Sequence, residues 1–230
     1  MTHRLDAVLS PVDLPAAELS AARLDGELFS IADRFTPVDL PESATSRAQA
    51  LAQELSARMI VEMRSAAWVL GATAVVPVNP EFCSRAEARA KPAAIRRLAV
   101  REVVIEDDEI LCLGGVRVTS PLRTASDLIR SSPDFGVETQ LVVLRLLEIA
   151  QSSVGECAAL LDGRRNLPGK RRALERLASI SVAAEPQVLA AASAVADAVD
   201  VVNGVDAPHR IQDAVEVGGV PHLEYELAQR

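Results

Sequence analysis

The chain has 230 residues, enough for one large or two small domains. Apolar residues make up 49% of it but aromatic residues only 3%, so its core must be built from Val, Leu, Ile and Ala. The formal net charge of −8 would repel nucleic acid if it were spread evenly over the surface. The most apolar stretch, Val182–Val202, contains three acidic residues, which argues against a membrane-spanning helix.

The residues at the start of the chain predict a helix followed at once by a β-ribbon. Residues 15–25 suit a short helix that ends at Gly26, and the alternation over residues 27–33 favours a strand. A helix and a ribbon form the back half of a winged helix, but the residues ahead of them are too few for its front helices. We therefore expect a truncated winged-helix-like segment over residues 1–40.

A mixed α/β domain with a small sheet and several helices is expected over residues 41–177, which makes the fold class α+β. Strands are predicted near residues 59–63, 97–105, 110–113 and 116–118. The Asp-Asp and Gly-Gly turns between the last three strands predict that they pair as a meander. The predicted helices cover residues 47–57, 66–71, 122–131, 137–150 and 153–162, with a further helix from residue 170. Residues 178–230 have weak periodicity and are expected to form a poorly defined tail.

Several positions carry specific expectations. Ser120 followed by Pro121 is a strong helix start. Ser65 is expected to cap the helix over residues 66–71. Arg123 and Asp127 are four residues apart and predict an ion pair within one helix. The side chains expected in the core are those of Trp68, Leu122, Leu128 and Leu144.

The positive charge is concentrated in two segments. Residues 83–101 contain six basic residues against one acidic residue, and residues 163–176 repeat that ratio. Residues 1–40, by contrast, contain three basic and seven acidic residues. Such segregation is typical of contact with nucleic acid or an acidic partner, although a solvated helix face is the plainer alternative. The expected contact residues are Arg96, Arg97, Arg101, Arg164, Arg165, Lys170, Arg171 and Arg172.

No catalytic or metal-binding pattern is visible. The three cysteines, Cys83, Cys112 and Cys157, are widely spaced and form no CxxC pair, which favours reduced thiols and a cytoplasmic protein. The first 15 residues contain acids and prolines where a signal peptide needs an apolar run. The three histidines lie at no ligand spacing, so we expect no metal and no cofactor.

Three stretches together carry a family resemblance: RSAAWVLGA at 64–72, GVRVTSPLRTASDLIR at 115–130 and RRNLPGKRRALERL at 164–177. They resemble actinobacterial proteins of the AbiEi-like antitoxin family of type IV toxin–antitoxin systems, over residues 15–177. The motif positions are Ser65, Trp68, Thr119, Pro121, Arg123, Thr124 and Asp127. The resemblance implies a winged helix that binds operator DNA and represses transcription, a domain that neutralises a nucleotidyltransferase-type toxin, and no enzymatic activity.

Two alternatives stay open beside this non-catalytic regulator. Similar segments precede very-short-patch-repair-like endonuclease domains in related proteins. Such a domain, active or decayed, needs convergent acids and a lysine, yet no lysine follows Lys170. Its acids would have to be Glu216, Glu224 and Glu226. The other alternative is an orphan interaction protein that has kept the fold without its partners.

Overall fold

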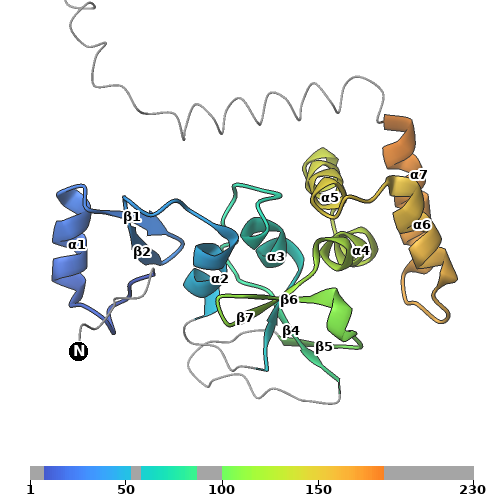
Figure 1. Cartoon of the computed structure of the whole chain (residues 1–230). Coiled ribbons are helices and arrows are strands. Elements are labelled where there is room, and N and C mark those ends of the chain that lie inside the picture. The colour runs from blue at the N-terminus through green and yellow to red at the C-terminus, as the bar shows by residue number, and fades with distance from the viewer. Residues whose placement is uncertain (1–7, 53–57, 87–99, 184–230) are drawn as a thin grey trace, which may run out of the picture. The chain divides into compact units, whose positions relative to one another are not determined.

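The computed structural model describes residues 8–52, 58–86 and 100–183, which Figure 1 draws in colour. These residues all lie in the first of two units into which the chain divides, residues 1–189 and 190–230. They form helices and two β-sheets, so the α+β prediction is confirmed. The described part contains no helix with both the length and the apolar character needed to span a membrane.

The first elements are helix α1 (Ala16–Leu24) and an antiparallel ribbon of β1 (Leu28–Ile31) and β2 (Arg34–Pro37). Gly26 joins helix to ribbon with a φ of +76°, which glycine adopts without strain. The predicted helix and ribbon are therefore confirmed. A winged helix is not established, because the described residues ahead of α1, residues 8–15, form turns and a β-bridge from Leu9 to Phe35 and contain no helix.

The second sheet has five strands in the order β5-β4-β3-β7-β6. They are β3 (Ile60–Val61), β4 (Phe82–Arg85), β5 (Val100–Val103), β6 (Ile110–Leu113) and β7 (Val116–Thr119). β3 runs parallel to β7 and β4 runs parallel to β5, whereas the β3–β4 and β6–β7 pairs are antiparallel. The sheet is therefore mixed, with the short strand β3 at its centre.

The predicted meander is wrong, although the β6–β7 hairpin within it is confirmed. β5 pairs with β4 at one edge of the sheet, and β6 forms the other edge. The centre is taken by β3 and by β4, a strand that the sequence pattern did not predict. Their residues Ile60, Val61, Phe82 and Cys83 are almost fully buried. Burial of these side chains stabilises the non-local pairing of β4 with β3 and β5, which takes the place of the local pairing of β5 with β6.

The helices that pack on this sheet and on one another follow most of the predicted positions. They are α2 (Ala44–Ala52), α3 (Met63–Val69), α4 (Pro121–Ser131), α5 (Val137–Ile149), α6 (Val154–Gly163) and α7 (Lys170–Ala183). α2 begins earlier than predicted because Ser43 and Ser46 exchange hydrogen bonds at its start, and residues 53–57 lie outside the described chain. α7 continues past the predicted domain limit at residue 177.

The two predicted helix caps differ in outcome. Ser120 is the N-cap of α4 and Pro121 is its first residue, as predicted. Ser65 is not a cap, because it lies inside α3, whose N-cap is Glu62. The helix starts earlier than expected because it follows β3 directly, and Glu62 is the last residue with an extended backbone.

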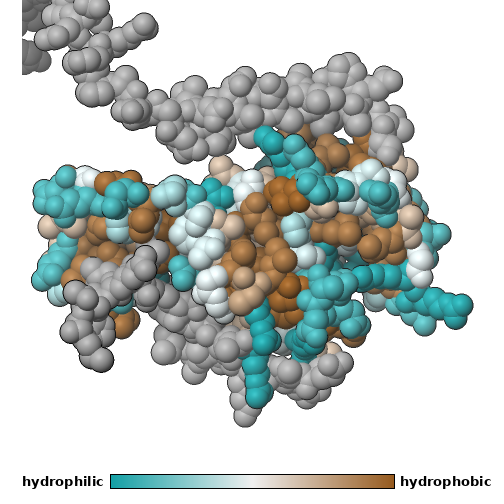
Figure 2. All heavy atoms as spheres, in the orientation of Figure 1, coloured by the Kyte–Doolittle hydropathy of each residue, from teal (hydrophilic) through white to brown (hydrophobic). Residues whose placement is uncertain are grey.

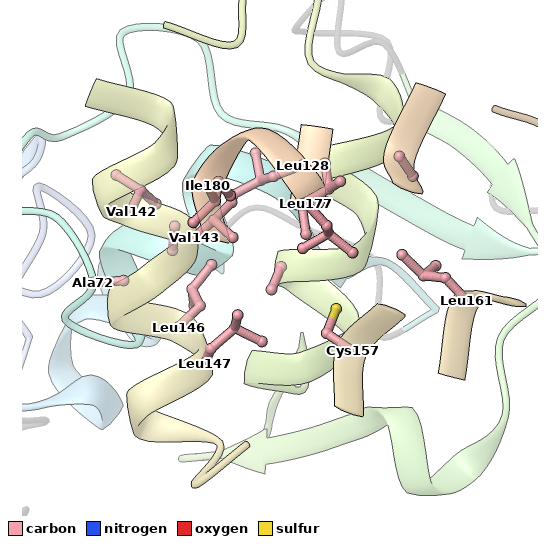
Figure 3. Packing of buried hydrophobic residues seen from close by; sticks show 14 of the residues in the cluster. Ala72, Leu128, Val142, Val143, Leu146, Leu147, Cys157, Leu161, Leu177 and Ile180 are labelled. Atoms are coloured by element: carbon pink, nitrogen blue, oxygen red, sulfur yellow. The ribbon is translucent and has the colours of Figure 1, made fainter. Parts of the chain in front are cut away.

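Apolar side chains form two main clusters. The larger lies among α3, α4, α5, α6 and α7 and includes Leu128, Leu146 and Leu177 (Figure 3). Trp68 belongs to the other, between α2, α3 and the sheet. Trp68 and Leu128 are 2% and 0% exposed, as predicted. Leu122 and Leu144 are only partly buried, contrary to prediction, because each lies at the flank of its helix's buried stripe.

One loop leaves apolar side chains at the surface. Val75, Val76 and Val78, between α3 and β4, are 65%, 38% and 94% exposed. Figure 2 shows apolar atoms gathered at the surface in this region, beside α3 and α5. The loop also borders a small cavity of about 50 Å³ whose lining includes Ala67 and Leu128, so the larger cluster reaches the surface here.

Candidate functional site

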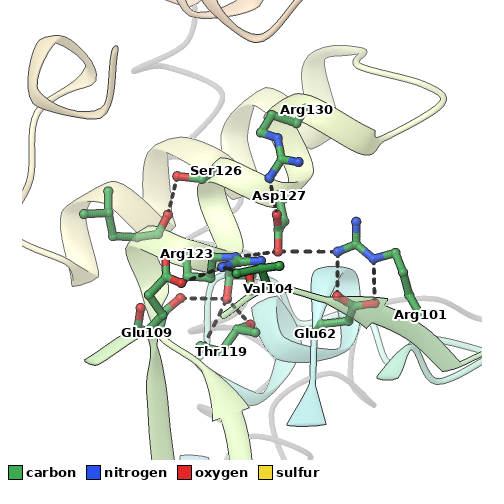
Figure 4. Close-up of polar contacts among 12 residues, drawn as sticks. Glu62, Arg101, Val104, Glu109, Thr119, Arg123, Ser126, Asp127 and Arg130 are labelled. Carbon is green, nitrogen blue, oxygen red and sulfur yellow. Dashed lines mark hydrogen bonds and ion pairs between the residues drawn. The ribbon is translucent and has the colours of Figure 1, made fainter. Parts of the chain in front are cut away.

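Charged side chains gather where β3 and β7 end and α4 begins. The two strands are parallel, so their carboxyl ends meet at one edge of the sheet. Glu62 directly follows β3, and Thr119, the last residue of β7, precedes the α4 N-cap. Arg123 and Asp127 on α4 therefore face Glu62 and the neighbouring strands (Figure 4).

Asp127 is shared by three arginines. Its carboxylate is 1% exposed and accepts hydrogen bonds from Arg123 Nε at 2.9 Å, Arg130 Nη1 at 2.9 Å and Arg101 Nη2 at 3.4 Å. The predicted pair of Arg123 and Asp127 is confirmed. A carboxylate buried to this extent is stable only because several charged donors replace its lost water.

Glu62 forms a two-pronged ion pair with Arg101. Arg101 Nε donates to Oε1 at 3.1 Å and Nη2 donates to Oε2 at 2.6 Å. This fork geometry is the strongest arrangement available to arginine and a carboxylate. Burial, and then the charge of Glu62, raise the pKa of the neighbouring Cys83 thiol, which keeps that thiol protonated.

Glu109 completes the network from the other side of Arg123. Arg123 Nη1 donates to Glu109 Oε2 at 2.6 Å and to the carbonyl of Val104 at 3.1 Å. Arg164, at the end of α6, pairs with Oε1 of the same carboxylate. Burial alone would raise the pKa of Glu109, but hydrogen bonds from Arg164 and the Glu106 backbone, together with the charge of Arg123, lower it.

We call these seven side chains the arginine–carboxylate network. Its members are Glu62, Arg101, Glu109, Arg123, Asp127, Arg130 and Arg164. Arginines outnumber carboxylates in it, and the pKa of Arg130 is lowered by burial and by the positive charges of Arg123 and Arg101, despite Asp127. Every carboxylate accepts from arginine, so the network is built to fix the sheet to the helices.

Two arginines, one of them in this network, attach the α6–α7 loop and α7 to α4 by hydrogen bonds. Arg130 Nε donates to the carbonyl of Pro168 at 3.1 Å. On α7, Arg176 donates to the carbonyls of Ile129 at 2.7 Å and Ser132 at 3.0 Å. These bonds give partners to backbone carbonyls at the end of α4, which lack them within the helix. The last part of the loop and the helix that follows it are therefore hydrogen-bonded to α4.

Three arginines lie in this loop and just after it, and we call them the basic edge: Arg165 in the loop, and Arg171 and Arg172 in the first turn of α7. All three are exposed, and the side chain of Arg171 is 94% exposed. Within the described residues, the ion pair found for this set is the solvent-exposed contact of Arg171 with Glu175 at 3.6 Å. Such a surface pair is weak, so the charge of the basic edge stays available to a partner.

The loop conformation depends on glycine at residue 169. Gly169 has a φ of +76°, and a Cβ atom there would lie 3.2 Å from the carbonyl oxygen of Arg130. We expect Gly169→Ala to lower the free energy of unfolding by about 1–3 kcal/mol, because it forces a side chain into the left-handed region. Urea unfolding measures this.

Gly163→Ala is the matched control, since it lies in α6 with nothing within 4 Å of the added carbon. It should be neutral or stabilising by up to about 1 kcal/mol. Equal stability of the two variants would show that the loop is not constrained as described.

The predicted contact residues divide into three groups. Arg96 and Arg97 lie outside the described residues. Arg101 and Arg164 belong to the network, where each side chain is 37% exposed. Lys170 is half-buried and pairs with Asp162 at 2.8 Å, which leaves Arg165, Arg171 and Arg172 as the exposed members.

Five of the seven motif residues lie around the start of α4. Arg123 and Asp127 are in the network, Pro121 begins the helix, and the hydroxyls of Thr119 and Thr124 bond at 2.7 Å. Trp68 is in the core, and the Ser65 hydroxyl accepts from the Glu81 backbone at 2.8 Å. The motif therefore supports the junction of sheet and helix.

Sequence reasoning missed Glu62, Glu109 and Arg130. Glu62 is a single acid within the apolar run MIVEM, and an acid in such a run signals a buried ion pair. Glu109 directly follows the Asp-Asp turn predicted between two strands, where an acid is ordinarily solvated. The described residues contain no group of His, Cys, Asp and Glu side chains suited to hold a metal, and Glu216, Glu224 and Glu226 lie outside them.

No protein-family model matches the chain, and no curated protein matches it.

Proposed function

We propose that this chain is a non-catalytic regulator of the AbiEi-like antitoxin type and that it binds duplex DNA through the basic edge. The observation that carries the proposal is the charge at the start of α7. Its first turn contains Lys170, Arg171 and Arg172 and no acidic residue. This places exposed cations at the positive end of a helix of 14 residues, which is unfavourable for the helix by itself.

Phosphate groups bound at this helix start would offset the repulsion between the arginines and the positive end of the helix dipole. The free backbone N–H groups of a helix start and its dipole attract anions, and exposed arginines add charge-assisted hydrogen bonds. The hydrogen bonds of Arg130 and Arg176 support this use, because they attach the backbone that carries the basic edge to α4. DNA binding is one of the two activities that the family resemblance implies, and toxin binding stays an expectation from that resemblance.

The charge pattern places the contact on α7 rather than on α1 and its ribbon. Residues 1–40 contain seven acids, and α1 carries Glu18 in its first turn. An acidic element approaches DNA against electrostatic repulsion. The proposal therefore keeps the regulatory function of the resemblance but moves the main phosphate contact to the basic edge.

Neutralising the basic edge tests this directly. We expect the triple variant Arg165→Gln, Arg171→Gln, Arg172→Gln to bind DNA roughly tenfold or more weakly than the wild type at low salt, because three phosphate contacts are lost. Fluorescence anisotropy measures the dissociation constant, with duplex DNA from upstream of the chain's own gene and an unrelated duplex.

Arg145→Gln is the matched control, since Arg145 is a half-exposed arginine on α5 that pairs with Glu148. It should leave the dissociation constant unchanged. Equal weakening by the control and the triple variant would show that only total charge matters, and an unaffected triple variant would refute the proposed contact.

A further inference from the structure

A second site lies on one face of the five-stranded sheet, apart from the network and the basic edge. It is an open pocket of about 490 Å³ on the sheet surface, called the cavity below, lined by Arg85, Asp107, Ile110, Cys112 and Arg117. A volume of this size is in the range of pockets that bind small molecules. Its lining combines two arginines with an apolar side chain and a thiol.

Strand register explains why the two arginines share this cavity. Ile60 on β3 pairs with Cys83 on one side and with Arg117 on the other. Arg85 follows Cys83 by two positions on β4, so side-chain alternation brings it to the face that Arg117 occupies. Cys112 on β6 pairs directly with Arg117, so it also lies on this face.

The arginines of this cavity are incompletely satisfied within the described chain. Arg85 Nε is buried and has no hydrogen-bond partner, although its Nη2 pairs with Asp107. The Asp107 side chain is 95% exposed, so water competes strongly for that pair. Arg117 is exposed, and no ion pair with another described residue is found for it. Buried donors are almost always paired, so Arg85 Nε has an unused hydrogen-bonding capacity that a bound anion would fill.

We propose that this cavity binds a phosphorylated small molecule. Its phosphate lies between Arg85 and Arg117, where the guanidinium groups donate charge-assisted hydrogen bonds to its oxygens. The less polar part of the ligand lies against Ile110 and Cys112. The lining holds two arginines against one carboxylate, that of Asp107, so its net positive charge attracts an anion.

Titration calorimetry with inorganic phosphate, at constant ionic strength set with chloride, tests the anion site. We expect saturable binding to the wild type and a roughly tenfold or greater loss of affinity in Arg117→Gln and in Arg85→Gln, because each removes a charged donor. Arg145→Gln should bind phosphate as the wild type does. Binding that does not saturate, or that both variants retain, would overturn the proposal.

Cys112 provides a second readout that does not depend on heat. Of the three cysteines, Cys112 is exposed while Cys83 and Cys157 are buried, so a thiol reagent reacts first at the cavity wall. Phosphate should slow this reaction in the wild type and in Arg145→Gln but not in Arg117→Gln. An equal rate with and without phosphate in the wild type would contradict occupation of the cavity.

The phosphate could instead belong to DNA, and the variants distinguish the two sources. For a free small molecule, a nucleoside monophosphate should bind at least as tightly as inorganic phosphate, and Arg117→Gln should leave DNA affinity unchanged. If Arg117→Gln weakens DNA binding roughly tenfold while Arg145→Gln leaves it unchanged, the cavity holds a backbone phosphate and the small-molecule assignment fails. This outcome is independent of whether the basic edge binds DNA.

Discussion

Replacing Asp127 with alanine is expected to lower the free energy of unfolding by about 3–5 kcal/mol, because it leaves buried charges without their partner. Asp127 is 1% exposed and accepts from Arg101, Arg123 and Arg130. Arg123 is itself 5% exposed, so water cannot replace the lost carboxylate around it. Urea unfolding followed by far-UV circular dichroism measures the change.

Two further variants separate charge from size. Asp127→Asn keeps the volume but loses the charge, and its amide N–H groups would meet guanidinium donors, so it should also be strongly destabilising. Glu148→Ala removes a carboxylate from the exposed pair with Arg145 and should change stability by less than about 1 kcal/mol. If Asp127→Ala were as mild as Glu148→Ala, the network would not hold the sheet to the helices.

Trp68→Ala is expected to cost about 3–5 kcal/mol, the usual range for deleting a buried aromatic side chain. Trp68 is 2% exposed and packs with Val61, Phe82 and Val118 of the sheet. Arg47 on α2 lies 5.7 Å from the ring centre and donates to the Trp68 carbonyl at 3.1 Å. Removing the indole would therefore open a cavity between the sheet and both helices.

Leu24→Ala is the control for this variant, because Leu24 at the end of α1 is 85% exposed. Its effect should stay within about 0.5 kcal/mol. Thermal unfolding of the three proteins gives the comparison. A melting temperature of Trp68→Ala equal to that of the wild type would contradict the packing of Trp68 against the sheet.

Local signals in the sequence were sufficient for the parts of the fold that depend on neighbouring residues. Ser120 and Pro121 predicted the start of α4, and the four-residue spacing of Arg123 and Asp127 predicted their ion pair. The Gly114-Gly115 turn likewise predicted the β6–β7 hairpin. Each of these depends on geometry within a single turn or helix.

The features that the sequence did not predict depend on contacts between distant residues. Arg101 meets Glu62 across 39 positions, and Arg164 meets Glu109 across 55. The parallel pairing of β4 with β5 is also non-local, and the segment FCSR has no clear strand pattern. Arg101 and Arg164 were expected to face a partner, but the fold uses both to neutralise buried carboxylates.

The salt dependence of DNA binding tests the central proposal most directly. Phosphate contacts release counterions, so the slope of log Kd against log salt reports how many are made, with about 0.9 for each. Between about 50 and 200 mM salt, the triple basic-edge variant should lose about two to three units of the wild-type slope. Arg23→Gln on α1 should retain the full slope. If the triple variant keeps the wild-type slope while Arg23→Gln loses binding, the DNA contact lies on α1 and its ribbon instead.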